Sequence, residues 1–186
     1  MARPGMLGRV ATQLETLGYE IPPHAWNERR EIAKCMFVSG NSQFDVLAPD
    51  DAIESELVVE GRIESIAMPG GRRALEVAEL VSIRYADEAF DVTARVPLLC
   101  GAVVVKTLAA IDPRTSSQSR HIQDVAVLLT LVEDPIEYLA RFSEADMKVM
   151  GAIRDRLLDD GDVAWEGIDL DDRLKAQAVV LLTRTS

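Results

Sequence analysis

Two apolar stretches decide the fold of the second half of the chain: VPLLCGAVVVKTLAAI at residues 96–111 and HIQDVAVLLTLV at residues 121–132. Each is predicted to form an apolar helix, and each carries one conspicuous charge in its body, Lys106 in the first and Asp124 in the second. A charge that is buried without a partner is costly. We therefore expect both side chains to be paired or to face a polar site.

The turn between these stretches sets the level of the two charges. If the first helix ends near Ile111 and the second begins near Ser119, Lys106 and Asp124 each lie about five residues, or roughly 7 to 8 Å, from the turn. In an antiparallel helix pair they would face each other at the same level. Two interpretations stay open: a buried salt bridge that fixes the helix register, or a lysine and a carboxylate that line a pocket for phosphates or a nucleic-acid end.

Length and composition describe a globular chain. Its 186 residues, 48% of them hydrophobic, fit one domain or one domain with a small helical extension. Arg9, Gln13 and Glu15 interrupt the apolar residues of the first turns, so a signal peptide is not expected there. No run approaches the roughly 18 uncharged apolar residues of a membrane span. We therefore expect no membrane association and a cytoplasmic location.

The formal net charge of −11 argues against a broad electrostatic grip on nucleic acid, although it leaves room for a local one. The acidic clusters near the C-terminus, at 159–162 and 169–172, are expected to be solvated helix ends, because they lack the spacing of an EF-hand loop. Cys35 and Cys100 are isolated and are predicted to be buried thiols. Metal binding by cysteine or histidine is not predicted.

The first part of the chain favours a helix followed by short strands. A helix is predicted over 6–17, ended by Gly18, and a loop over 21–30. Two runs of β-forming residues, 33–38 and 43–47, flank a Ser-Gly-Asn-Ser turn and predict a hairpin. Asp45 projects alone from one side of the second strand, where it could also be a merely exposed edge-strand carboxylate.

The rest of the chain changes from strands to helices. Residues 75–85 and 90–96 predict a second hairpin. After the paired helices we predict a short helix at 135–142, one helix that starts at Ser143 with a capping box to Asp146, and a last helix at about 171–183. These later helices carry apolar residues at Met147, Met150, Ile153, Leu157 and Leu158, and at Leu174, Ala178, Leu181 and Leu182. The predicted class is α+β, with a sheet region at 1–96 and a helical region at 97–186.

Two segments carry a resemblance to a known family. PLLCGAVVVKTLAA at 97–110, followed by RHIQDVAVLL at 120–129, resembles the C-terminal half of the AbiEii nucleotidyltransferase toxin family. In that family a helix with a lysine and small residues precedes a polar turn and a helix that opens with a basic residue and an aspartate. FDVLAPD at 44–50 resembles the strand that bears the third active-site carboxylate. The resemblance implies a nucleotidyltransferase-like mixed sheet followed by a helical portion.

The same resemblance implies an activity and a set of roles. The family transfers a nucleotide from a nucleoside triphosphate, with magnesium, onto an RNA end or similar acceptor, and it is the toxin of a toxin-antitoxin or abortive-infection pair. Asp45 would then be a catalytic residue and a magnesium ligand, and Lys106 and Asp124 would line the catalytic pocket. Lys106 and Arg120 would bind the substrate. A cognate antitoxin would be the protein partner.

One part of the family pattern is missing. The family's first motif is a Gly-Ser or Gly-Gly turn before a strand with two carboxylates at alternate positions, and residues 1–31 contain no aspartate. Two-metal nucleotidyl transfer needs several carboxylates to hold the ions. Asp50 and Asp51 fall on the turn after the Asp45 strand and are poorly placed to replace them. We therefore predict that the chain is a truncated or degenerate nucleotidyltransferase and is inactive as it stands.

Two other functions remain as alternatives. The first is a non-catalytic module that binds a nucleotide, RNA or an antitoxin and uses Lys106, Arg120 and Asp124 for contact. The second is a purely structural or interaction domain in which Lys106 and Asp124 form a pair that sets the helix register.

Overall fold

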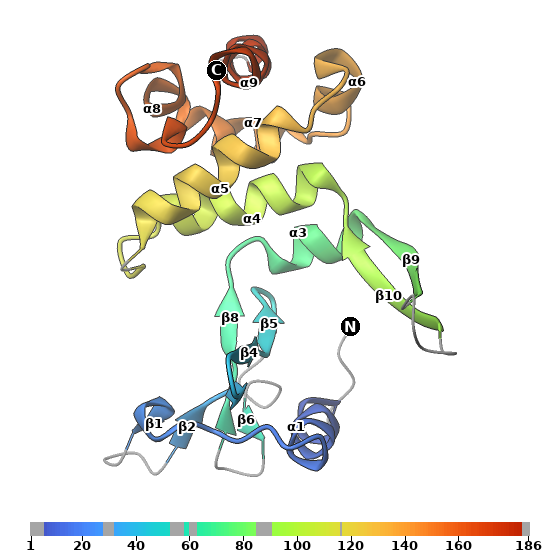
Figure 1. Ribbon diagram of the computed structural model, residues 1–186. Coiled ribbons are helices and arrows are strands. Elements are labelled where there is room, and N and C mark those ends of the chain that lie inside the picture. Colours follow the sequence, from blue (N-terminus) through green and yellow to red (C-terminus); the bar gives the residue numbers. More distant parts are fainter. Residues whose placement is uncertain are drawn as a thin grey trace. The chain divides into compact units, whose positions relative to one another are not determined.

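The computed structural model describes residues 6–27, 32–52, 58–59, 63–84, 91–115 and 117–183 (Figure 1). The chain forms two compact units, Met1–Gly71 and Arg72–Ser186, each of which is described by itself. The sequence places the division between residues 96 and 97, whereas the compact units divide between Gly71 and Arg72. The expected α+β class is confirmed at the level of a mixture of helices and small sheets.

The first unit opens with helix α1 (Met6–Thr16), as predicted. It ends before Gly18, which has a φ of +82° and so occupies the left-handed conformation that favours glycine. The buried side of α1 packs Ala11 and Leu14 against Phe37 and Ile63. The predicted loop at 21–30 is wrong in part, because it contains the 3-10 turn η1 (Pro23–Ala25) and the short strand β1 (Trp26–Asn27).

The strands of the first unit form several small sheets. Among the described residues, one sheet has the order β1, β2 (Ile32–Lys34), β7 (Ile63–Glu64) and β6 (Val58–Val59), with β2 and β7 parallel. Strands β3 (Met36–Ser39) and β4 (Ser42–Asp45) form the predicted antiparallel hairpin. Strands β5 (Leu47–Pro49) and β8 (Ile66–Met68) pair in parallel.

The second unit begins with elements that the sequence assigned to the sheet region. Helix α3 (Gly71–Glu76) leads into strand β9 (Ala78–Arg84), which pairs with β10 (Asp91–Pro97) as an antiparallel hairpin. The predicted hairpin is therefore confirmed, with Leu75 in a helix instead of a strand; its connection, residues 85–90, lies outside the described residues. Gly101 allows the next helix to pack closely here, since a Cβ at this position would lie 2.6 Å from Val77 Cγ2.

Helices make up the rest of the second unit. They are α4 (Leu99–Ile111), α5 (Gln118–Thr130), α6 (Pro135–Leu139), α7 (Glu144–Gly151), α8 (Arg154–Leu158) and α9 (Leu170–Leu182), with the 3-10 turn η2 (Val163–Trp165) before α9. The single helix predicted from Ser143 is wrong, because α7 ends at Gly151 and α8 begins at Arg154. Glycine is a poor helix former, which accounts for a break at this point. Their shared core includes Leu129, Leu157 and Trp165.

A partly buried ion pair joins α3 to α7. Asp146, whose residue is 5% exposed, accepts hydrogen bonds at Oδ2 from Arg73 Nε and from the Ser143 backbone N–H, each at 2.9 Å. Ser143 and Asp146 thus form the predicted capping box. Arg73 also donates from Nη2 to the Arg141 carbonyl at 2.9 Å. The sequence did not indicate Arg73, because it lies 73 residues from Asp146.

Candidate functional site

The antiparallel pair α4 and α5 brings Lys106 and Asp124 together. Lys106 Nζ lies 2.6 Å from Asp124 Oδ2, so the two charges do face each other at the same level. Their side chains are 39% and 34% exposed, so the pair is partly exposed and differs in this from the buried salt bridge that was one of the two interpretations of the sequence. Each charge is neutralised by the other, at a position that solvent can reach.

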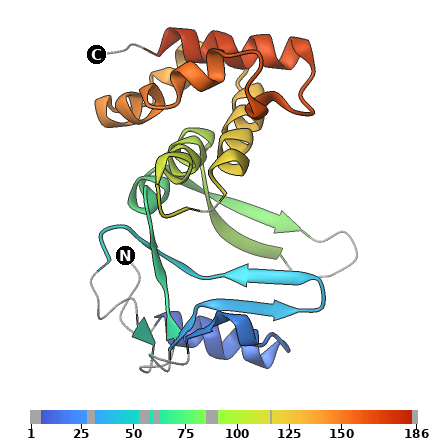
Figure 2. The ribbon, with the colours of Figure 1, turned by 90° about the vertical axis from the view of Figure 1, so that its left-hand side faces the viewer.

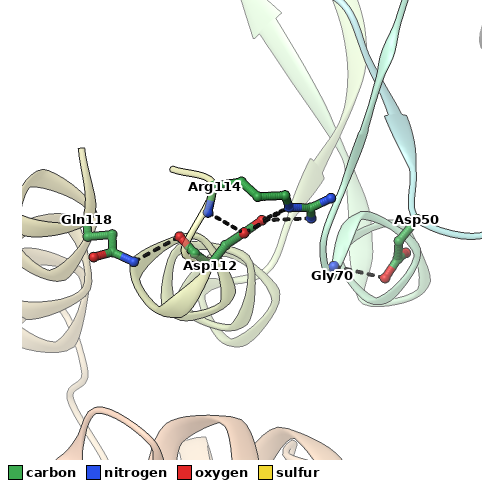
Figure 3. A network of polar contacts seen from close by, with 5 residues as sticks. All are labelled: Asp50, Gly70, Asp112, Arg114 and Gln118. Carbon is green, nitrogen blue, oxygen red and sulfur yellow. Dashed lines mark hydrogen bonds and ion pairs between the residues drawn. The ribbon is translucent and has the colours of Figure 1, made fainter. Parts of the chain in front are cut away.

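The turn after α4 is held by Asp112. Its carboxylate accepts hydrogen bonds from the Arg114 backbone N–H at 2.9 Å and from Arg114 Nη2 at 2.8 Å, and Gln118 Nε2 donates to its carbonyl at 2.8 Å (Figure 3). Hydrogen bonds from Arg114 lower the pKa of Asp112 below its usual value, and the carboxylate in turn raises the pKa of Arg114. Arg114 is therefore already occupied by a carboxylate.

His121 lies near the same carboxylate oxygen of Asp124. Its Nδ1 is 3.7 Å from Asp124 Oδ2, which is too long for a hydrogen bond, and this nitrogen is buried with no hydrogen-bond partner in the described part of the chain. Arg120 is exposed at the start of α5, and no ion pair links it to another described residue. Of the predicted substrate-binding cations, Lys106 is therefore paired and Arg120 faces solvent.

Asp45, the predicted catalytic and magnesium-binding residue, belongs to the first unit. It ends strand β4, where all four residues are exposed. Gln43 Nε2 donates to both carboxylate oxygens of Asp45, at 3.1 Å and 3.0 Å. Burial raises the pKa of the Cys35 thiol to about 11, and the negative charge of Asp45 adds to this effect. Asp45 is thus an exposed hairpin carboxylate, held by a neighbouring amide.

Asp50 has a local structural role. Its Oδ2 accepts a hydrogen bond from the Gly70 backbone N–H at 3.0 Å, within the first unit (Figure 3). Gly70 has a φ of +76°, so the bond holds a turn that favours glycine. In the part of the chain that the structure describes, no three His, Cys, Asp or Glu side chains form a group that could hold a metal ion.

Comparisons with known proteins give no relative: no family model, curated protein or solved structure matches this chain. Among the described helices, none is long and apolar enough to cross a membrane.

A candidate surface that was not predicted from the sequence lies on α9, away from the α4–α5 turn. This helix packs against α5, α6 and α8, and in both views of the ribbon its opposite side points away from these helices (Figures 1 and 2). Its buried side consists of Ala176, Gln177, Val179 and Val180. The apolar residues predicted for the last helix, together with Leu170, lie on its exposed side. We call these residues the outer face of α9; they are Leu170, Leu174, Ala178, Leu181 and Leu182.

The outer face of α9 is conspicuously apolar. Its four leucines are between 50% and 60% exposed. A helix that packs on one side only normally has charged and polar residues on the other, whereas a helix that is apolar around its circumference is normally buried. The sequence does contain a sign of this exposed apolar side. Val179 and Val180 lie between Leu174 and Leu181, and the valines and the leucines cannot both face the same core.

Proposed function

We propose that this chain is a non-catalytic protein-binding module and that the outer face of α9 is its contact surface. The observation that carries the proposal is the set of four half-exposed leucines on one side of a helix whose other side is already packed. Contiguous apolar patches on folded proteins commonly mark interaction sites. The sequence left open a non-catalytic module that binds a nucleotide, RNA or an antitoxin. The proposal selects the module that binds a protein.

The charges at the α4–α5 turn support a structural role for Lys106. Its ammonium group lies 2.6 Å from Asp124, so a phosphate would have to displace that carboxylate to reach it. Arg114 is similarly bound to Asp112. A lysine and an arginine that serve a bound nucleotide are expected to offer their charge to the ligand. The pairs seen here instead stabilise the turn and the helix register.

A nucleotidyltransferase-like protein is the second candidate function. The observation in its favour is the sequence of the α4–α5 pair, whose Lys106, Arg120 and Asp124 match the resemblance to the AbiEii toxin family. That resemblance implies a nucleotidyltransferase-like fold, magnesium, a nucleoside triphosphate and an RNA acceptor. The cytoplasmic location expected from the sequence is part of the same candidate function. It also implies an antitoxin, and an antitoxin would be a suitable occupant of a protein-binding surface. We expect this chain to lack the transferase activity.

Two measurements test the proposal. Photo-crosslinking from position 174, in cells that produce the chain, should give a discrete higher-mass protein adduct, and crosslinking from the more exposed position 80 on β9 should not. Incubation of the purified chain with labelled nucleoside triphosphates, magnesium and RNA should give no incorporation. Incorporation that is lost in both Asp45→Asn and Lys106→Met would overturn the proposal in favour of the enzyme.

A further inference from the structure

We propose that the outer face of α9 receives a cationic amphipathic helix of a partner protein. This inference rests on the proposed function and adds to it the shape and charge of the partner.

The stripe has the form of one side of a helix–helix contact. Leu170, Leu174 and Leu181 follow one another at spacings of four and seven residues, and the small side chain of Ala178 lies between the last two. From Leu170 to Leu182 the stripe is about 18 Å long, or roughly three turns. A partner helix can place its own large apolar side chains over Ala178 and between the leucines, as ridges of one helix pack into the grooves of another.

The charges around the stripe are unequally distributed. Glu166, Asp169 and Asp171 are exposed at the N-terminal end of α9. The two cations of the helix already have partners, since Lys175 Nζ lies 2.9 Å from Asp172 Oδ1 and Arg173 Nε lies 3.7 Å from Asp160 Oδ1. These charges together leave an excess of negative charge beside the start of the stripe. Basic residues on a partner would complement it.

The same charge disfavours other occupants. Two copies of a chain with a net charge of −11 repel each other at long range, and an anionic membrane surface repels the chain for the same reason. A cationic helix gains from this field during encounter and then buries the leucines. Its basic residues should lie near Asp171, and its most apolar end should lie over Leu181 and Leu182.

A synthetic probe tests the inference on the full chain. The probe is a fluorescein-labelled helical peptide of leucine, alanine and lysine, with leucines at i, i+3, i+4 and i+7, lysines on the opposite side of the helix and alanines at the positions between. The matched peptide has glutamate in place of lysine. Fluorescence anisotropy should show one-to-one binding of the lysine peptide that weakens as salt is added, and little binding of the glutamate peptide.

Variants of the chain locate the binding. Leu174→Gln combined with Leu181→Gln should weaken binding by about tenfold or more, because two apolar contacts are lost. Leu80→Gln, on β9, changes a leucine that is even more exposed and should leave binding unchanged. Asp171→Asn with Glu166→Gln should weaken binding by a few-fold and make it less sensitive to salt. Circular dichroism checks that each variant folds.

Three kinds of outcome would overturn the inference. The first is a failure to locate binding at the outer face, either because the lysine peptide does not bind or because it binds equally to the Leu174→Gln, Leu181→Gln variant. The second is equal binding of the glutamate peptide. The third is a dimer, seen by sedimentation, that the same two substitutions dissociate, because a second copy would then cover the face. An adduct from position 174 together with no peptide binding would retain the protein-binding function and reject only the cationic helix.

Discussion

The α4–α5 turn and the outer face of α9 differ in how their conspicuous residues are satisfied. At the turn, Lys106 and Asp124 are charges in apolar helices, and each finds its partner within the chain at 2.6 Å. On α9, four leucines are apolar residues at the surface, and they stay about half exposed. A feature that the fold itself satisfies needs only a structural explanation. A set of apolar side chains that the fold leaves exposed along one side of a helix points to another molecule.

The largest expected effect is a difference in the free energy of unfolding between a substitution in the packed core and one on the outer face of α9. Leu129→Ala, at a fully buried position of α5, should lower the free energy of unfolding by about 2 to 5 kcal/mol, because it leaves a cavity. Leu174→Ala should change it by less than about 0.5 kcal/mol, because the side chain is already exposed. Urea unfolding followed by circular dichroism measures both. A comparable cost for the two substitutions would mean that the outer face is packed in solution.

The next largest effect is expected at the Arg73–Asp146 ion pair, which is less exposed than the Lys106–Asp124 pair. Asp146→Ala leaves Arg73 without its carboxylate and removes half of the capping box, so the free energy of unfolding should fall by about 3 kcal/mol. Ser143→Ala removes the capping hydroxyl alone and should cost about 1 kcal/mol. Equal losses in the two variants, measured by urea unfolding, would show that Arg73 contributes nothing.

A smaller effect should appear as a pH dependence. Hydrogen bonds from Arg156, at 2.8 Å and 3.0 Å, lower the pKa of Asp162 below its usual value. A carboxyl with a lowered pKa in the folded state contributes stability above its unfolded-state pKa of about 4 and loses it as the pH falls through the lower folded-state value. Below pH 4, the midpoint of unfolding should therefore fall less steeply with decreasing pH in Arg156→Met than in the unsubstituted chain. Unchanged steepness would contradict this assignment.

The smallest effect should come from Lys106. Because the Lys106–Asp124 pair is more than one third exposed on both sides, Lys106→Met should cost less than about 1 kcal/mol. Adding Asp124→Asn should recover most of that loss, since it removes the carboxylate left unpaired. A thermal unfolding scan of the single and double variants measures the coupling. A loss of several kcal/mol would show that the turn carries more stability than the exposed pair can explain.

Local spacing explains what the sequence predicted correctly at the candidate site. The helical rise and the short turn between α4 and α5 put Lys106 opposite Asp124 whatever the rest of the chain does. The roles of Asp45, Lys106, Asp124 and Arg120 in nucleotide transfer stay predictions, because they came from resemblance. The exposure of the Lys106–Asp124 pair could not be predicted, because it depends on which elements cover the turn.

The sequence by itself determined the elements whose cause is local: the end of α1 at Gly18, the β3–β4 hairpin and the capping box of α7. Only the tertiary structure decided that Arg73 binds Asp146 and that α9 buries its valines and exposes its leucines. Caps and turns depend on neighbouring residues, and their energies act within a few positions. A helix that is apolar on two sides can pack by either one, and the choice is made by contacts with residues far away in the sequence.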